Sequence, residues 1–136
     1  MIVLDTNIVL DAFLFNDPGA QPLKRALTSR QIRWLATPPM RDELARVLAY
    51  PKIMVQLLRH ELTVAAVLLQ FDGLVQPVAV AARASVRCRD PDDQKFIDLA
   101  VAHQSTLLSK DAAVLCLAKR LLALDVHVRQ ALDFVA

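Results

Sequence analysis

Residues 2–7 read Ile-Val-Leu-Asp-Thr-Asn, and this stretch decides the fold class. Its first three residues form a short, wholly apolar run, which is typical of a strand buried on both faces in a parallel sheet. Asp5 follows this run directly, and a helical pattern begins at about Asn7. An acid therefore lies at the carboxyl end of a predicted buried strand, where open α/β sheets bind their ligands.

Strand and helix patterns alternate along the rest of the chain. Further strands are predicted at 32–36, 75–80, 106–108 and 126–128, and Pro77 favours an edge position or a loop for 75–80. Helices are predicted over 7–15, 22–29, 38–49, 52–59, 61–71, 92–104, 111–122 and 130–135. Strands separated by helices predict a parallel sheet of four to five short strands, covered on both sides, in a single domain spanning residues 1–136.

Composition excludes several function classes. The chain has 136 residues and only two glycines, so it has no glycine-rich phosphate loop of the kind used by nucleotide-binding α/β folds. Aromatic residues make up 5%, which disfavours a base-stacking platform, and the net charge of +2 permits a nucleic-acid partner without requiring one. Cys88 and Cys116 lack metal-ligand spacing. We expect a cytoplasmic protein without a membrane partner, because no signal-type or bilayer-length apolar run occurs.

Four acids occupy related positions in these predicted elements. Asp5 follows the first strand and Asp111 follows the strand at 106–108. At 100° per residue, Glu43 borders the apolar face of its helix and Asp93 falls within the apolar arc of a later one. Each has a simpler explanation alone, because Asp is a favoured helix cap and an acid complements the helix dipole.

Together the four acids favour a metal site. No lysine or arginine is expected on those two helix faces to neutralise them. Clustered carboxylates repel one another, and Mg²⁺ binds oxygen ligands and phosphate esters. The pattern therefore predicts one acidic, magnesium-binding site formed by Asp5, Glu43, Asp93 and Asp111.

The same residues carry a resemblance to a known family. Leu4-Asp5-Thr6-Asn7 resembles the opening motif of PIN domains, Glu43-Leu44 resembles their second acid, Asp93 the third, and Ser109-Lys110-Asp111 the fourth. Residues 89–96 are similar to the subfamily of toxin components of toxin–antitoxin systems, with Gln94 at a position that is often acidic there. The resemblance implies a three-layer α/β/α fold and a Mg²⁺- or Mn²⁺-dependent ribonuclease that cleaves single-stranded RNA. It also implies a homodimer and an antitoxin partner.

The hypothesis is hydrolysis of an RNA phosphodiester. Asp5, Glu43 and Asp93 would bind one Mg²⁺, and Asp111 would complete that site or help to hold a second ion. Thr6, Asn7 and Ser109 are candidates for orienting carboxylates or water, although local capping explains them equally well. Basic side chains that could steer RNA, but are explained more simply as solvated, are Arg41, Arg46, Lys52 and Arg59.

Two alternatives remain open. The first is a non-catalytic PIN-like interaction module, in which the apolar segments 54–58 and 64–69 form a groove for a partner helix. Ordinary core packing is the favoured explanation of those segments. The second is a phospho-acceptor receiver domain, which is disfavoured because Thr6-Asn7, and not an acid, follows Asp5.

Overall fold

The computed structural model describes residues 1–130 and contains a five-stranded parallel sheet of order β3-β2-β1-β4-β5. The strands are β1 (Ile2–Leu4), β2 (Trp34–Ala36), β3 (Val75–Pro77), β4 (Thr106–Leu108) and β5 (Val128–Arg129). β1 is central and pairs in parallel with β2 and β4, with Leu4 opposite Leu108. The predicted parallel α/β class is confirmed, and β3 with its Pro77 lies at the edge, as predicted.

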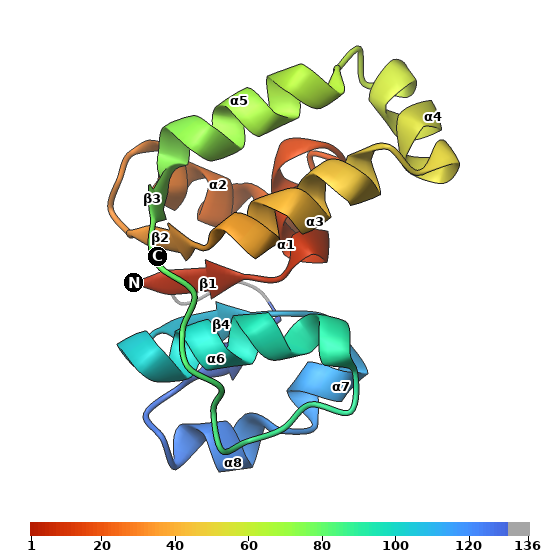
Figure 1. Ribbon diagram of the computed structural model, residues 1–136. Coiled ribbons are helices and arrows are strands. Elements are labelled where there is room, and N and C mark those ends of the chain that lie inside the picture. Colours follow the sequence, from red (N-terminus) through yellow and green to blue (C-terminus); the bar gives the residue numbers. More distant parts are fainter. Residues whose placement is uncertain (131–136) are drawn as a thin grey trace.

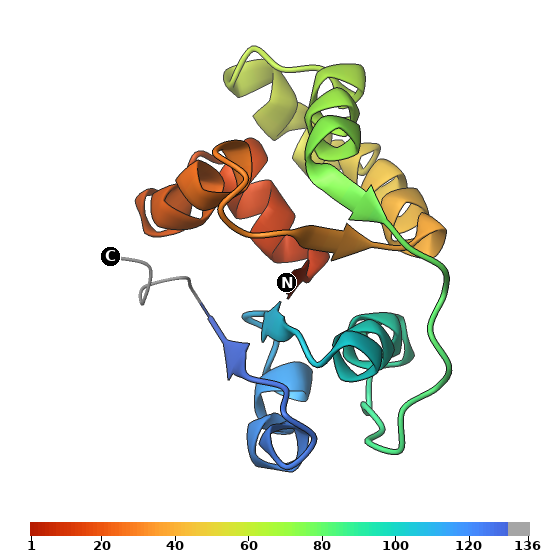
Figure 2. The same cartoon turned by 90° about the vertical axis from the view of Figure 1, so that its left-hand side faces the viewer.

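The helices form two groups, one next to the half of the sheet that contains β2 and β3 and one next to the half that contains β4 and β5. On the β2–β3 side of β1 lie α1 (Thr6–Phe13), the short η1 (Pro18–Ala20), α2 (Gln21–Thr28), α3 (Pro38–Leu48), α4 (Pro51–Arg59) and α5 (Val64–Leu74). On the β4–β5 side lie η2 (Pro91–Asp93), α6 (Gln94–His103), α7 (Ala112–Leu115) and α8 (Ala118–Leu122) (Figure 1). Figure 2 shows α1 and α6 on opposite sides of the sheet, so β1 is covered from both faces.

The buried core explains why the short strands are stable. Residues 2–4 are at most 3% exposed, and Trp34 of β2 stacks on Phe13 and meets the edge of the Phe71 ring. Each buried aromatic side chain removes a large apolar area from water, which compensates for strands of only two or three residues.

Several predicted boundaries were wrong for local reasons. The helix predicted over 111–122 is two short helices separated at Cys116 and Leu117. The helix predicted to end before Asp72 instead includes Asp72 and Gly73, and the Arg30 guanidinium donates a 2.8 Å hydrogen bond to the Gly73 carbonyl, which satisfies one carbonyl in its last turn. The helix predicted over 130–135 lies outside the described residues, except for Gln130.

The favoured core-packing explanation of segments 54–58 and 64–69 was also wrong in part. Leu57 and Val67 are buried, but Leu58 is 78% exposed and Leu69 is 74% exposed. Met54 and Val55 are about half exposed as well. Within residues 1–130 no single helix is long and apolar enough to cross a bilayer, and α4 and α5 reach that length only as a pair bent by 86°.

Candidate metal centre

Three of the four predicted acids meet at the carboxyl edge of the sheet. Carboxylate oxygens of Asp5, Asp93 and Asp111 all lie within 4.8 Å of one another. Asp5 leaves the end of β1, Asp111 comes three residues after the end of β4, and Asp93 ends η2 where α6 begins. Since β1 and β4 are hydrogen-bonded neighbours, their ends deliver Asp5 and Asp111 to one place.

Asp5 is held by the neighbouring strand and is not used as a helix cap. It occupies the N-cap position of α1, but its side chain makes no capping hydrogen bond there. The Ser109 hydroxyl instead donates a 2.7 Å hydrogen bond to its Oδ2, and the Asp5 backbone N–H donates to the Leu108 carbonyl. Burial raises the pKa of Asp5, the Ser109 hydrogen bond opposes this rise, and the charge of Glu43 adds to it.

Asp93 and Asp111 form an unequal pair. Burial, a hydrogen bond with Asp111 and the nearby charge of Asp5 raise the pKa of Asp93 to about 8. The same hydrogen bond lowers the pKa of Asp111, whose side chain also accepts a 2.9 Å hydrogen bond from the Ala113 N–H and so caps α7. The capping explanation is thus correct for Asp111. Near neutral pH the metal-free protein keeps a proton on Asp93, because burial and the negative charges of the adjacent Asp5 and Asp111 disfavour its ionisation.

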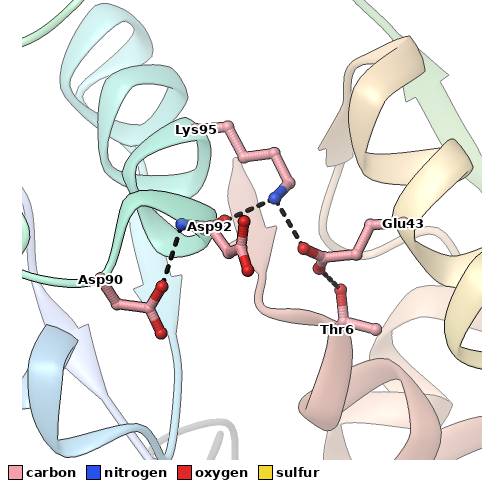
Figure 3. A network of polar contacts seen from close by, with 5 residues as sticks. All are labelled: Thr6, Glu43, Asp90, Asp92 and Lys95. Atoms are coloured by element: carbon pink, nitrogen blue, oxygen red, sulfur yellow. Dashed lines mark hydrogen bonds and ion pairs between the residues drawn. The ribbon is translucent and has the colours of Figure 1, made fainter.

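Glu43 lies beside this group in a different environment. Its Oε1 accepts a 2.7 Å ion-pair hydrogen bond from Lys95 Nζ, and its Oε2 accepts a hydrogen bond from the Thr6 hydroxyl (Figure 3). The expectation that no lysine or arginine neutralises the acids on the two helix faces was therefore wrong for Glu43. Lys95 is two residues beyond Asp93 on α6, about 200° around the helix, but its long side chain reaches back to Glu43.

Lys110 and Gln94, which lie next to Asp111 and Asp93 in the sequence, both have partners outside the group of three aspartates. Lys110 forms an ion pair with Asp11 on α1, so its ammonium does not neutralise Asp111. Gln94 accepts a 2.7 Å hydrogen bond from the Cys88 N–H and donates to the Val86 carbonyl and to Asp98. Gln94 therefore fixes the segment before η2 against α6, a structural role that its sequence position did not reveal.

The acids line an open cleft of about 400 Å³. Its remaining lining residues, from α1, α3 and η2 with the turns beside them, are Thr6, Asn7, Arg46, Val47, Tyr50 and Asp92. An apolar groove adjoins the cleft and shares Asn7, Val47 and Tyr50 with it, and its other lining residues are Leu10, Pro51, Lys52 and Ile53. Asn7 is exposed and lines both the acidic cleft and the apolar groove, so its side chain could contact a ligand bound in either of them.

The aspartates suit a hard divalent cation. Asp93 is only 7% exposed, and its Oδ2 has no hydrogen-bond partner among the described residues. A buried carboxylate oxygen without a partner is costly, whereas Mg²⁺ and Mn²⁺ bind such oxygens directly. Burial and neighbouring negative charges raise the pKa values of both Asp5 and Asp93. A bound divalent cation would supply the positive charge that stabilises both carboxylates in their ionised form.

The chain is thus an α/β protein whose short parallel sheet presents a group of aspartates at its carboxyl edge, in an acidic cleft. The PIN domain family model matches residues 1–113, and the chain therefore belongs to the PIN domain family. The match spans all four predicted acids. No curated protein matches the chain.

One solved structure shares the fold over nearly the whole chain. The chain is similar to a protein in the crystal structure of VapBC2 from Rickettsia felis bound to a DNA fragment from its promoter. The TM-score is 0.62 at 15% sequence identity, and the alignment covers 94% of this chain and 98% of the other. The three-layer PIN-like fold is thereby confirmed.

Proposed function

We propose that this protein is a Mg²⁺- or Mn²⁺-dependent endoribonuclease that hydrolyses phosphodiesters of single-stranded RNA. The observation that carries the proposal is the group of three aspartates within 4.8 Å, one of which has a buried and unpartnered oxygen. Family membership supports the same chemistry. Asp5, Asp93 and Asp111 would hold the cation, and Glu43 would contribute negative charge beside it.

The chain's own residues prepare the site for this reaction. A divalent cation, when bound, supplies Lewis acidity toward a phosphate group and a more acidic water. Ser109 fixes the Asp5 carboxylate and Thr6 fixes that of Glu43, so both carboxylates need little reorganisation when a cation binds. The open cleft leaves room for an extended strand, and Arg46 on its wall is placed to attract a phosphate.

The test is cleavage of a labelled single-stranded RNA with and without Mg²⁺ or Mn²⁺. We expect Asp5→Asn and Asp93→Asn to reduce the rate by about 100-fold or more, because loss of a metal ligand removes several kcal/mol of transition-state stabilisation. Asp42→Asn is the matched control, since Asp42 is exposed on the same helix as Glu43 and does not line the cleft. Equal rates for the wild type and the two site variants would contradict the proposal.

We further propose that the protein is the toxin of a toxin–antitoxin pair and that its antitoxin binds the apolar groove beside the cleft. The groove includes Tyr50, which is 53% exposed, and the exposed apolar side chains of α4 continue from it. The similar solved structure is of a VapBC2 assembly, which supports a protein partner. Such a partner would cover the apolar surface and obstruct the cleft at the same time.

Two experiments address the partner and the oligomer. Expression of the chain alone should arrest growth, and co-expression with the neighbouring reading frame should restore it; absence of arrest would count against the toxin role. A Met54→Asp variant should retain cleavage but escape neutralisation, because Met54 is exposed on α4 and does not line the cleft. We expect the isolated chain to be a homodimer, and light scattering at micromolar concentration would measure its mass.

A further inference from the structure

The Lys95 ammonium is held in a cation position of its own. Its Nζ lies 2.7 Å from Glu43 Oε1, also donates to the Asp92 carbonyl, and lies 4.9 Å from the centre of the Phe96 ring. The Lys95 and Glu43 side chains are only 22% and 14% exposed, so solvent screens this pair weakly. These contacts are two oxygens and an aromatic face, all of which favour a positive charge.

Glu43 has no remaining need for a metal ion. One of its carboxylate oxygens is occupied by Lys95 and the other by the Thr6 hydroxyl. The aspartate group is different, because Oδ2 of Asp93 is buried and has no hydrogen-bond partner among residues 1–130. The two adjacent acidic groups therefore differ: both oxygens of Glu43 are engaged within the chain, whereas Asp93 keeps one buried oxygen without a partner among the described residues.

From this contrast we infer that Lys95 takes the place of a second divalent cation, so that the cleft binds one metal ion, on Asp5, Asp93 and Asp111, and Glu43 is not a direct ligand. This inference rests on the metal site of the proposed function. Both carboxylate oxygens of Glu43 already have partners within the chain, so a second ion there would have to displace them. A second ion at Glu43 would also be repelled by the adjacent ammonium. Lys95 is a positioning residue for this site.

The number of bound ions tests the inference independently of catalysis. Mn²⁺ binding would be measured by calorimetry and by electron paramagnetic resonance on the full chain. We expect one ion per wild-type chain and two per chain in Lys95→Met, where the oxygens around Glu43 lose their resident cation. Lys95→Arg keeps the charge and should remain at one ion. The matched control is Lys110→Met, which removes the lysine next to Asp111 that pairs with Asp11, and it should also remain at one ion.

A Glu43→Gln variant supplies the second readout. Glu43 is not a direct ligand in this scheme, so the Mn²⁺ affinity of the Glu43→Gln protein should fall by about tenfold or less, as expected for loss of a group that does not touch the metal. The Asp93→Asn protein should lose most of its Mn²⁺ binding. Two ions in the wild type, one ion in a folded Lys95→Met, or loss of binding in Glu43→Gln would each overturn the inference. If the wild type cleaves RNA with one bound ion and Lys95→Met also binds one ion, only this inference fails. If the wild type neither binds Mn²⁺ nor cleaves RNA, the proposed function fails as well as the inference.

Discussion

Ser109 and Asp5 are 104 residues apart in sequence, and the hydroxyl of one donates a buried 2.7 Å hydrogen bond to Oδ2 of the other. The same hydroxyl accepts a 3.1 Å hydrogen bond from the Asp111 N–H. Ser109 therefore connects two of the three aspartates directly and fixes the carboxylate of one of them. Its side chain is completely buried, so water cannot replace these contacts without a rearrangement.

Ser109→Ala should weaken Mn²⁺ binding by about 10–100-fold, because an outer group that orients a ligand is lost. The pKa of Asp5 should rise further, since the Ser109 hydrogen bond now lowers it. Calorimetric titration with Mn²⁺ measures the first effect. Ser105→Ala is the matched control: Ser105 Oγ is buried without a hydrogen-bond partner among the described residues, so its removal should leave binding unchanged. Equal affinities for the two variants would contradict this role of Ser109.

The metal-free protein should lose stability as the pH rises from about 4 to about 8. The pKa of Asp93 is about 8 in the folded chain and its ordinary value is 3.8, so over this range the folded state holds a proton that the unfolded state has released. The loss should be at most about 1 kcal/mol per pH unit, discounted because the cleft is open to water. Urea unfolding in EDTA measures it. Asp93→Asn should flatten this dependence, and an equal slope in that variant would exclude Asp93 as its source.

Metal binding should become tighter over the same pH range. A cation that binds Asp93 must displace its proton, so binding releases up to one proton and the affinity rises by at most about tenfold per pH unit below pH 8. Titrations in two buffers of different ionisation enthalpy would count the protons released. No proton release at pH 6.5 would show that the carboxylates are already ionised before the metal binds.

Gln94→Ala should destabilise the fold by about 1–3 kcal/mol, because it leaves the Cys88 N–H and the Val86 carbonyl without their hydrogen-bond partner. Gln70→Ala on α5 is the control, since Gln70 is exposed and its loss should change stability by less than about 0.5 kcal/mol. Thermal unfolding measures both. If the two variants unfold at the same temperature, Gln94 does not anchor the segment before η2.

Arg46→Ala should weaken RNA binding and reduce its salt dependence, because Arg46 lies on the wall of the acidic cleft. Arg41→Ala is the control on the same helix. Arg41 is engaged by Asp72 through two 2.8 Å hydrogen bonds, away from the cleft lining. Binding of single-stranded RNA to a catalytically inactive Asp5→Asn protein at several salt concentrations measures the effect. Equal salt slopes for the two arginine variants would remove Arg46 from the RNA path.

The fold class was predictable because its strongest signals are local. Ile2, Val3 and Leu4 are apolar without alternation, and the structure buries all three in the central strand. Pro77 correctly predicted an edge strand, because proline cannot donate a ladder hydrogen bond. The break between α7 and α8 was not predictable from periodicity, since the apolar residues around it continue a helical pattern.

The candidate site was predictable in its acids but not in its charge balance. Strand ends and helix faces place Asp5, Asp93 and Asp111 together, as their backbone positions suggested. The ion pair between Glu43 and Lys95 depends on a flexible side chain that crosses between two helices 52 residues apart in sequence. Helix-face geometry follows backbone direction and placed no lysine or arginine on the two faces that carry Glu43 and Asp93, so side-chain reach was the missing information.

The pairing of β1 with β4 also affects when the three aspartates can come together during translation. The strand that forms the middle of the sheet is synthesised first, but its β4 neighbour and the last of the three aspartates emerge from the ribosome about 100 residues later. A nascent chain thus lacks the complete group of three aspartates until Asp111 has been made. Contacts so distant in sequence also form slowly during folding. The proposed activity therefore requires nearly all of the described chain, which leaves time for the proposed binding partner to reach the protein before the site is complete.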